Sequence, residues 1–409
     1  MYQKYKAYFL GTEDKHAHFF EIAASPYDSM FYSDSKVFGN GEHKIHIIDQ
    51  FCGKRPALFN HEFCTNDDEL KLNFWCSITL DSNVVSLLHE LVTNRSEMNV
   101  DQHDATHEFL RHLTEVNCDY SPIFYVMESF FKSDEDNFYE HVPKVLSSVL
   151  KLHSMNEAIF LKDGVITPKP DAIKYYCELY NSSSLDGCGL HWAQRIVKDI
   201  RDTDVEYKVN LTYASLLKMV LIKHADNKGI YKKSEEFENF MMDELGIRLA
   251  RESSLALYYF SNLAGKFINT QANMAFDVAV HDLKATAWDL YLLKLPEQLL
   301  TPNDLPELNT SYVATSEVKL YEIGKLFDIQ HLAYRTDNAN KGIPVLSFDM
   351  LDIENKVGNT TVAKLMKRNE EISFRRMAKE NIDGIHHHKL ESLINDLEIQ
   401  LSYLCVKHT

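Results

Sequence analysis

A short apolar run that ends in an aspartate, and passes directly into a helical pattern, constrains this chain more than any other feature. Residues 74–80 are mostly apolar and β-branched in part, which is typical of a buried strand. The run stops at Asp81, and apolar residues at helical spacing occupy residues 84–91. In open α/β sheets, ligands bind at the carboxyl ends of strands. Asp81, with Ser82 and Asn83 beside it, therefore either contributes to a site for a hard cation such as Mg²⁺ or caps the helix that follows.

The composition is that of a globular protein with room for a large core. A chain of 409 residues predicts two or three domains, and 45% hydrophobic with 25% charged residues is ordinary. The formal net charge of −17 argues against a sequence-blind nucleic-acid coat, but not against a nuclease whose metal ions neutralise its acids. Seven cysteines without paired spacing predict reduced thiols in a cytoplasmic protein. Apolar stretches are too short to span a bilayer, so we expect no membrane role.

A second carboxylate falls inside a strongly apolar helix. Ser121 and Pro122 are favourable residues at a helix start, and Glu128 lies among the aliphatic and aromatic residues that follow. An ionised carboxylate in such surroundings is costly unless it is paired or bound to a cation. Glu128 therefore either takes part in a cation site or points outward into solvent.

A strand ending in Asp-x-Asn, followed by Ser-Pro at a helix start and a Glu within that helix, resembles the PIN-domain nucleases. That superfamily includes the toxin ribonucleases of toxin–antitoxin pairs, and its pattern continues with an acid at the start of an Ala-rich helix and another after a strand ending in Thr. Asp282 resembles the first of these acids, with Asp289 two turns further along the same helix face. Glu317, two residues after Thr315, resembles the second, although the family usually has Asp there. The distance from Glu128 to Asp282 is also much longer than in the compact toxin domains.

The resemblance implies an α/β fold, a PIN-like three-layer α/β/α domain with a central, mostly parallel sheet. It covers residues 71–135 and 275–330, which are expected to form the two parts of that domain. Residues 136–274 show helical apolar spacing and predict a large helical insertion. We expect a β-rich N-terminal segment over residues 1–70 and a mixed segment, ending in a helix, over residues 331–409.

The resemblance also implies a metal-dependent nuclease, with RNA favoured over DNA as the substrate. Carboxylates that are brought together repel one another, and Mg²⁺ or Mn²⁺ ions would relieve that repulsion and coordinate phosphate oxygens. The implied catalytic and metal-binding acids are Asp81, Glu128, Asp282 and Glu317, with Asp289 as a further ligand or a group that supports one. Supporting polar groups are expected from Ser82, Asn83 and Thr315.

The most basic window of this acidic chain is a helix predicted over residues 362–379. The residues expected to contact nucleic-acid phosphates are Lys364, Lys367, Arg368, Arg375 and Arg376. Many members of the family dimerise, so a homodimer is a further expectation, and the helical insertion offers a surface for a protein partner. By analogy with the family, candidate roles include a growth-arresting toxin and an effector of antiviral defence.

Two other interpretations stay open at this point. A PIN-like fold that no longer cuts would serve as a binding or scaffold module, which the Glu317 departure and the acidic composition favour. An unrelated helical interaction protein would use Asp81 only as a helix cap and expose Glu128 to solvent. Metal titration separates the non-cutting module from a nuclease, and acids that lie far apart in the folded chain would select the unrelated protein.

Overall fold

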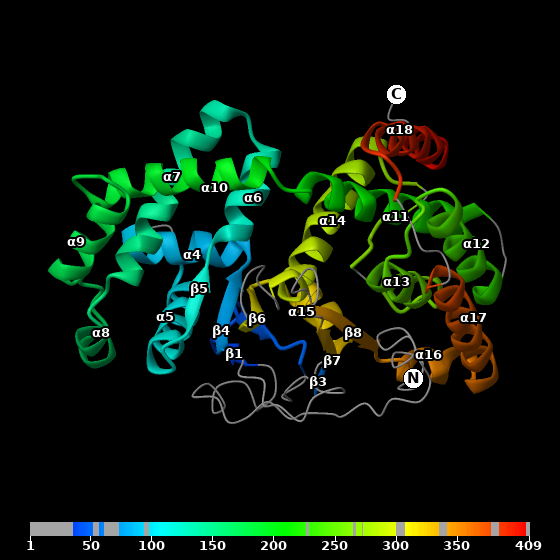
Figure 1. Ribbon diagram of the computed structural model, residues 1–409, viewed down its shortest axis with the longest axis horizontal. Helices are drawn as coiled ribbons and strands as arrows, with labels where there is room; N and C mark the ends of the chain where they lie inside the picture. Colours follow the sequence, from blue (N-terminus) through cyan, green and yellow to red (C-terminus); the bar gives the residue numbers. More distant parts are fainter. Residues whose placement is uncertain are drawn as a thin grey trace.

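The computed structural model describes residues 36–51, 57–60, 73–93, 98–225, 229–264, 267–271, 273–299, 307–334, 342–377 and 384–405. Within these ranges the protein is a mixed α/β structure in which helices predominate. In Figure 1 the long helix α14 (Phe276–Leu299) crosses the middle of the molecule. The helices of residues 82–201 lie on one side of it, and those of residues 205–260 and 351–404 lie on the other.

The central sheet is mixed. Its five strands are, in spatial order, β1 (Val37–Phe38), β2 (Ile45–Ile48), β6 (Glu307–Thr315), β4 (Asn73–Leu80) and β5 (Asp119–Ser121). Strand β4 pairs in parallel with both β5 and β6, whereas β2 pairs antiparallel with β6 and with β1. The strand predicted over residues 74–80 is confirmed, and it lies in the parallel part of the sheet. The expected parallel arrangement therefore holds for the three strands around β4 and not for the β1–β2 edge.

A second sheet joins segments from both ends of the chain. Its strands are β3 (Ala57–Asn60), β7 (Phe327–Tyr334) and β8 (Gly342–Phe348), in that order. Strand β3 is parallel to β7, and β7 is antiparallel to β8. The N-terminal strands thus pair with strands beyond residue 300 in both sheets. The remainder of the predicted β-rich N-terminal segment, residues 1–35, 52–56 and 61–70, lies outside the described residues.

Helices account for most of the described structure. Between β4 and β5 the chain forms α4 (Ser82–Thr93) and α5 (Val100–Glu115), and α6 (Ile123–Lys132) begins directly after Pro122. The other helices are α7 (Glu135–His153), α8 (Glu157–Asp163), α9 (Pro170–Leu179), α10 (Leu185–Arg201), α11 (Val205–Ala225), α12 (Ile230–Asp243), α13 (Ala250–Phe260), α15 (Val318–Gly324), α16 (Leu351–Val357), α17 (Asn359–Met377) and α18 (His387–Leu404). The helical character predicted for residues 136–274 is confirmed in the described part of that range.

Two of these helices end earlier than their apolar spacing predicts. The spacing predicts helices over residues 237–249 and 254–268, but α12 ends at Asp243 and α13 ends at Phe260. Gly246 has a φ of 67° and Asn262 a φ of 57°. These left-handed conformations end a helix, and glycine and asparagine adopt them most readily.

The two faces of the central sheet differ in polarity because side chains alternate along each strand. Buried apolar residues of β2, β4 and β6 pack on one face against α4 and α5. On the other face β4 and β6 carry polar pairs, with Ser77 Oγ donating to Asn309 Oδ1 over 3.1 Å and the hydroxyls of Thr79 and Ser311 3.1 Å apart. Helix α14 contacts β6. The polar face leads to the end of β4, where Asp81 lies.

Helix α14 is buried around most of its circumference. Its buried residues include Trp288, Leu290, Leu292 and Leu293, which do not fall on a single stripe. They pack with residues of α6, α11 and α18 in the largest core cluster. A helix that is apolar on all sides belongs in a protein interior, so any carboxylate along it needs a specific polar surrounding.

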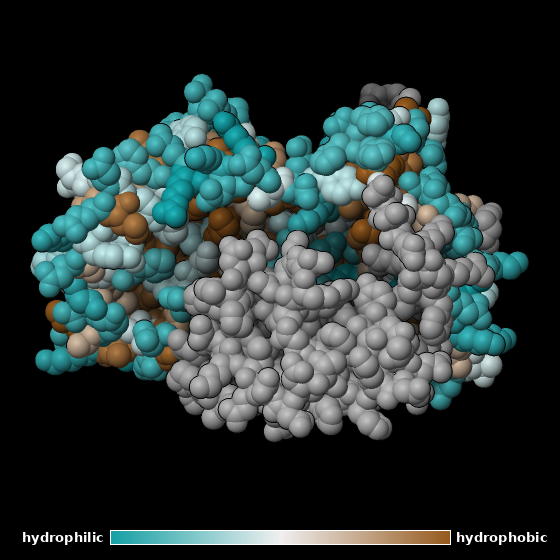
Figure 2. All heavy atoms as spheres, in the orientation of Figure 1, coloured by the Kyte–Doolittle hydropathy of each residue, from teal (hydrophilic) through white to brown (hydrophobic). Residues whose placement is uncertain are grey.

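Hydrophilic residues predominate on the described part of the face shown in Figure 2, with hydrophobic residues scattered among them. Scattered exposed hydrophobic residues are normal for a folded protein. Among the described helices, none combines the length and the apolar character that crossing a bilayer requires.

The tight contact between α7 and α10 predicts that a glycine-to-alanine substitution in a helix lowers stability. Helices α7 and α10 approach so closely at Gly189 that an added Cβ would lie 2.3 Å from the Pro143 carbonyl oxygen and 2.8 Å from the Ser147 nitrogen. We expect Gly189→Ala to lower the free energy of unfolding by about 1–3 kcal/mol, although alanine is the better helix former. Denaturant unfolding measures this. Gly229→Ala is the control, because nothing lies within 4 Å of its added Cβ, and equal stability of the two variants would contradict the packing.

Candidate active site at the end of strand β4

The backbone fixes Asp81 between the sheet and the helix that follows it. Its N–H donates to the Ala314 carbonyl oxygen of β6 over 2.9 Å, and its own carbonyl accepts from the Val85 N–H of α4 over 3.0 Å. The side chain is buried, and Thr315 Oγ1 donates to Asp81 Oδ2 over 2.6 Å. The Ser82 N–H favours the ionised form of the Asp81 carboxyl and acts against the rise in its pKa. Asp81 therefore precedes α4 directly and its side chain faces the end of β6.

The two polar residues after Asp81 each hold a different acid. Ser82 Oγ donates to Glu128 Oε2, and Asn83 Nδ2 donates to Glu317 Oε1 over 2.9 Å. The first turn of α4 thereby connects α6 with the segment after β6. Glu128 does not point outward into solvent, because Ser82 and Lys132 bind its two carboxylate oxygens.

The second partner of Glu128 is Lys132, one turn further along α6. Lys132 Nζ lies 2.5 Å from Glu128 Oε1. This lysine was not among the residues singled out from the sequence, although its i,i+4 spacing from Glu128 is a recognisable signal for an ion pair. It places a positive charge beside the acids.

Thr315 links the two strand ends through one hydroxyl group. Thr315 Oγ1 donates to Asp81 and accepts from the Glu317 N–H over 3.0 Å. The Thr-x-acid sequence therefore orients Glu317, an exposed residue at the N-cap of α15, relative to buried Asp81. On the far side of Thr315, its register partner in β2 is the buried His46, whose ring stacks on Tyr321 at 4.3 Å.

Four carboxylates lie close enough here to act on one another. Burial, together with the charges of Glu317 and Glu128, raises the pKa of Asp81 to about 7, against the hydrogen bond from Thr315. Burial also raises the pKa of Asp289 well above its usual range, and the carboxylates of Glu317, Asp81 and Glu128 add to that effect. Lys132 acts in the opposite direction on Asp289. The acids come from four elements that are far apart in the sequence.

Asp282 lies outside this group, and its predicted place in the helix is wrong. Helix α14 begins at Phe276, so Asp282 is in its second turn and not at its start. Seven residues correspond to about 10 Å along a helix axis, so Asp282 shares a face with Asp289 but lies two turns away from it. Its side chain is 39% exposed and lies 3.6 Å from His281 Nδ1. Asp289, and not Asp282, is the residue of α14 whose carboxyl lies near Asp81, Glu128 and Glu317.

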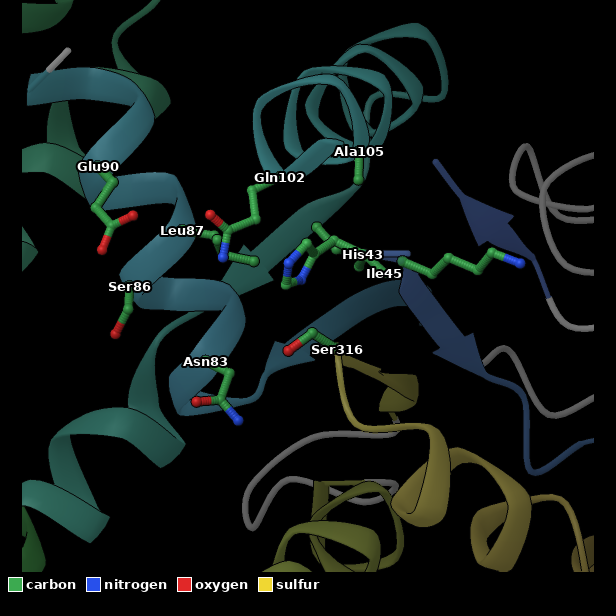
Figure 3. Close-up of a pocket in the computed structure, with 10 residues that line it drawn as sticks. His43, Ile45, Asn83, Ser86, Leu87, Glu90, Gln102, Ala105 and Ser316 are labelled. Carbon is green, nitrogen blue, oxygen red and sulfur yellow. The ribbon is translucent and has the colours of Figure 1, made fainter. Parts of the chain in front are cut away.

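A pocket adjoins the acids on the side of α4 and β2. Its volume is about 280 Å³. Among the residues that line it are Asn83 and Ser316, which border the acid group, and His43 and Gln102. In Figure 3, His43 and Gln102 point toward one another across the pocket, and Asn83 and Ser316 lie at one edge. The lining also includes the apolar residues Ile45, Leu87 and Ala105, so a molecule that reached the acids from this side would meet both polar and apolar groups.

The acids do not form a finished metal cage. Among the residues that the structure describes, no three His, Cys, Asp or Glu side chains are gathered closely enough to hold a metal ion. The carboxylate oxygens instead point to Thr315, Ser82, Asn83 and Lys132. The oxygen-rich donor set nevertheless matches the ligands that Mg²⁺ and Mn²⁺ prefer, and these hydrogen bonds would have to open for the acids to hold an ion.

The basic residues predicted to contact phosphates are remote from the acids. Helix α17 lies at the opposite side of the molecule from β4 along its longest axis (Figure 1). Lys364 and Lys367 are exposed there, whereas Arg368 Nη2 forms an ion pair with Glu235 at 3.1 Å. The side chains of Arg375 and Arg376 lie outside the described part of the structure.

Comparisons with known proteins give no family for this chain. It matches no protein-family model, no curated protein and no solved structure.

The raised pKa of Asp81 predicts how one neutral substitution changes stability with pH. A carboxyl whose pKa is higher in the folded state destabilises the fold when ionised, so stability falls as pH rises from about 4 to about 7. We expect Asp81→Asn, in a chelator, to gain stability over the wild type across that range, by at most about 4 kcal/mol above pH 7. Denaturant unfolding at pH 4 to 8 measures the difference. A constant difference across this pH range would contradict the assignment.

Proposed function

We propose that this protein is a metal-dependent phosphodiester hydrolase that cleaves nucleic acid, with RNA the favoured substrate. The observation that carries the proposal is the convergence of four mutually repelling carboxylates at the carboxyl end of parallel strands. Binding Mg²⁺ or Mn²⁺ relieves such repulsion. The acids of the proposed site are Asp81, Glu128, Asp289 and Glu317.

The proposed site belongs to a PIN-like three-layer domain. Support comes from the packing of α4 and α5 on one face of the central sheet and the contact of α14 with β6. The order of the acids along the chain also supports it, with the helices between α6 and α14 as an insertion. The set of acids differs from the family pattern in using Asp289 for Asp282 and in having a glutamate, Glu317, where the family has an aspartate.

Three of the four acids have a neighbour that sets the direction of the side chain. Thr315 orients Asp81, Ser82 orients Glu128, and Asn83 orients Glu317. A divalent ion held by the acids would supply an activated water and would stabilise negative charge on a phosphate and its leaving oxygen. With a pKa of about 7, Asp81 can accept or release a proton near neutral pH when no ion is bound. Lys132 supplies a positive charge beside the acids.

A PIN-like module that binds without cutting is the second candidate. Two observations favour it, the glutamate at position 317 where the family has aspartate, and the absence of a ready three-ligand group among the described side chains. Such a module would bind its partner with the same affinity in the presence of Mg²⁺ and of a chelator. The proposed hydrolase requires the ion for turnover.

Cleavage assays test the proposal. We expect the purified full chain to cut labelled RNA with Mg²⁺ or Mn²⁺ and not with a chelator. Asp81→Asn and Asp289→Asn should each lower the rate by about a hundredfold or more, because each removes a charged oxygen ligand. Labelled DNA of the same sequence decides the substrate class.

Asp282→Asn is the matched control for Asp289→Asn, because the two residues lie on the same face of α14. The proposal expects this variant to keep the wild-type rate. A rate lost in Asp282→Asn and kept in Asp289→Asn would refute the proposed site. Wild-type protein that cuts neither RNA nor DNA with either ion would refute the function and leave the binding module.

A further inference from the structure

The pocket beside the four acids contains polar groups that the proposed cleavage chemistry does not use. Its volume of about 280 Å³ is close to the lower limit for small-molecule sites, so it suits a single flat ring system. Asn83 and Ser316 lie at one edge of it, and Asn83 also donates to Glu317 of the acid group. A nucleotide with its phosphate at the acids would therefore have this pocket beside it.

The apolar part of the lining gives a flat ring a surface to pack on. Ile45 and Ala105 are buried there, and Leu87 is half-buried. The exposed His43 adds an imidazole ring, which points toward Gln102 across the pocket (Figure 3). Proteins recognise unpaired RNA bases by stacking them on aromatic side chains, including histidine, and by hydrogen bonds to the base edges.

The N-terminal cap of α5 fixes the direction of the Gln102 amide. Gln102 Oε1 accepts from the Asn99 N–H over 3.2 Å, and Asn99 Oδ1 accepts from the Gln102 N–H over 2.8 Å. The amide nitrogen Nε2 takes no part in this reciprocal contact. The pocket thereby gains an N–H donor whose orientation is set by the helix cap.

Glu90 contributes the complementary acceptor. It is half-buried near the end of α4 and lines the same pocket as Gln102. An ionised carboxylate only accepts hydrogen bonds, and it can accept two side by side. Among the four RNA bases, guanine alone carries two neighbouring N–H donors on its Watson–Crick edge, N1–H and the 2-amino group, beside the O6 acceptor. One carboxylate and one amide N–H match that edge.

We propose that this pocket is a guanine subsite of the proposed nuclease. The Glu90 carboxylate accepts from guanine N1–H and from the 2-amino group, and Gln102 Nε2 donates to O6. His43 and Leu87 pack against the base. The inference rests on the proposed function, because the phosphate that belongs to this base is the one at the acids. It adds a substrate preference, which is RNA with a guanine next to the bond that is cut.

Calorimetric titration of the full chain with ribonucleosides, in a chelator, tests the subsite without any cleavage. Guanosine should bind at least about tenfold more tightly than adenosine, cytidine or uridine, because paired hydrogen bonds to a base edge discriminate by about that factor. Inosine lacks only the 2-amino group of guanosine and should bind more weakly than guanosine. Nucleosides carry no phosphate, so repulsion from the four acids does not enter the measurement.

Two substitutions of nearly equal size change the hydrogen-bonding groups and keep the helices. Glu90→Gln removes one of the two acceptor oxygens and should lower the guanosine affinity by at least about tenfold. Gln102→Glu keeps an oxygen for the Asn99 cap, since glutamate is favoured at that position, but loses the donor to O6. It should weaken guanosine binding by a similar factor. Glu115→Gln is the control, because this exposed glutamate of α5 does not line the pocket, and it should keep the wild-type affinity.

Equal affinities for the four nucleosides would overturn the subsite, as would no binding of guanosine up to its solubility limit. An unchanged guanosine affinity in Glu90→Gln would overturn it too, because the nucleoside would then bind elsewhere. None of these results bears on the hydrolase, which the cleavage assays test separately. Selective guanosine binding by a chain that cuts no RNA would support the guanine site and refute only the hydrolase.

Discussion

Carboxylates held close together in a protein interior repel one another, and the rest of the site depends on how this chain accommodates that repulsion. Asp81 is buried at the end of β4, where its pKa is raised to about 7, and Asp289 meets it from α14. The four acids receive hydrogen bonds from Thr315, Ser82 and Asn83, and one nearby lysine, Lys132, pairs with Glu128. A single positive charge is small compensation for four acids, which is the physical reason for proposing a divalent cation.

Sheet and helix contribute different things to the site. The parallel pairing of β4 with β6 brings Asp81 and Thr315 together, because the carboxyl ends of parallel strands meet at one edge. Helix α14 brings Asp289 to that edge, although it belongs to a segment more than 200 positions later in the chain than Asp81. The same helix contributes Lys294 and Glu297, which form ion pairs with Glu252 and Arg251 at the start of α13. One buried helix thus positions charged groups in two separate clusters.

Local sequence patterns were sufficient to predict these strands, helices and turns, but not which side chains meet in the folded chain. The strand ending at Leu80, the helix after Pro122 and the Thr-x-acid turn at Thr315 each have a local signature. No local signature in the sequence distinguishes Asp289 from Asp282. Both lie on one face of α14, and only the position of β6 against that helix decides which one reaches Asp81.

The buried ion pairs between α13 and α14 were not predicted from the sequence, for a similar reason. Nothing near Arg251 in the sequence indicates a buried guanidinium, because its partners Gln50 and Glu297 are distant along the chain. A buried charge is recognisable only with its partners in place. Lys132 is the opposite case, since its spacing from Glu128 was visible in the sequence.

Calorimetric titration of the full chain with Mn²⁺ tests most directly whether the four acids act as one site. Wild type should bind one or two ions, and single replacement of Asp81 or Asp289 by Asn should weaken binding by about tenfold to a hundredfold. Replacing the exposed Asp282 by Asn should leave the titration unchanged. Identical titrations for all four proteins would contradict the account, since the ions would then bind elsewhere.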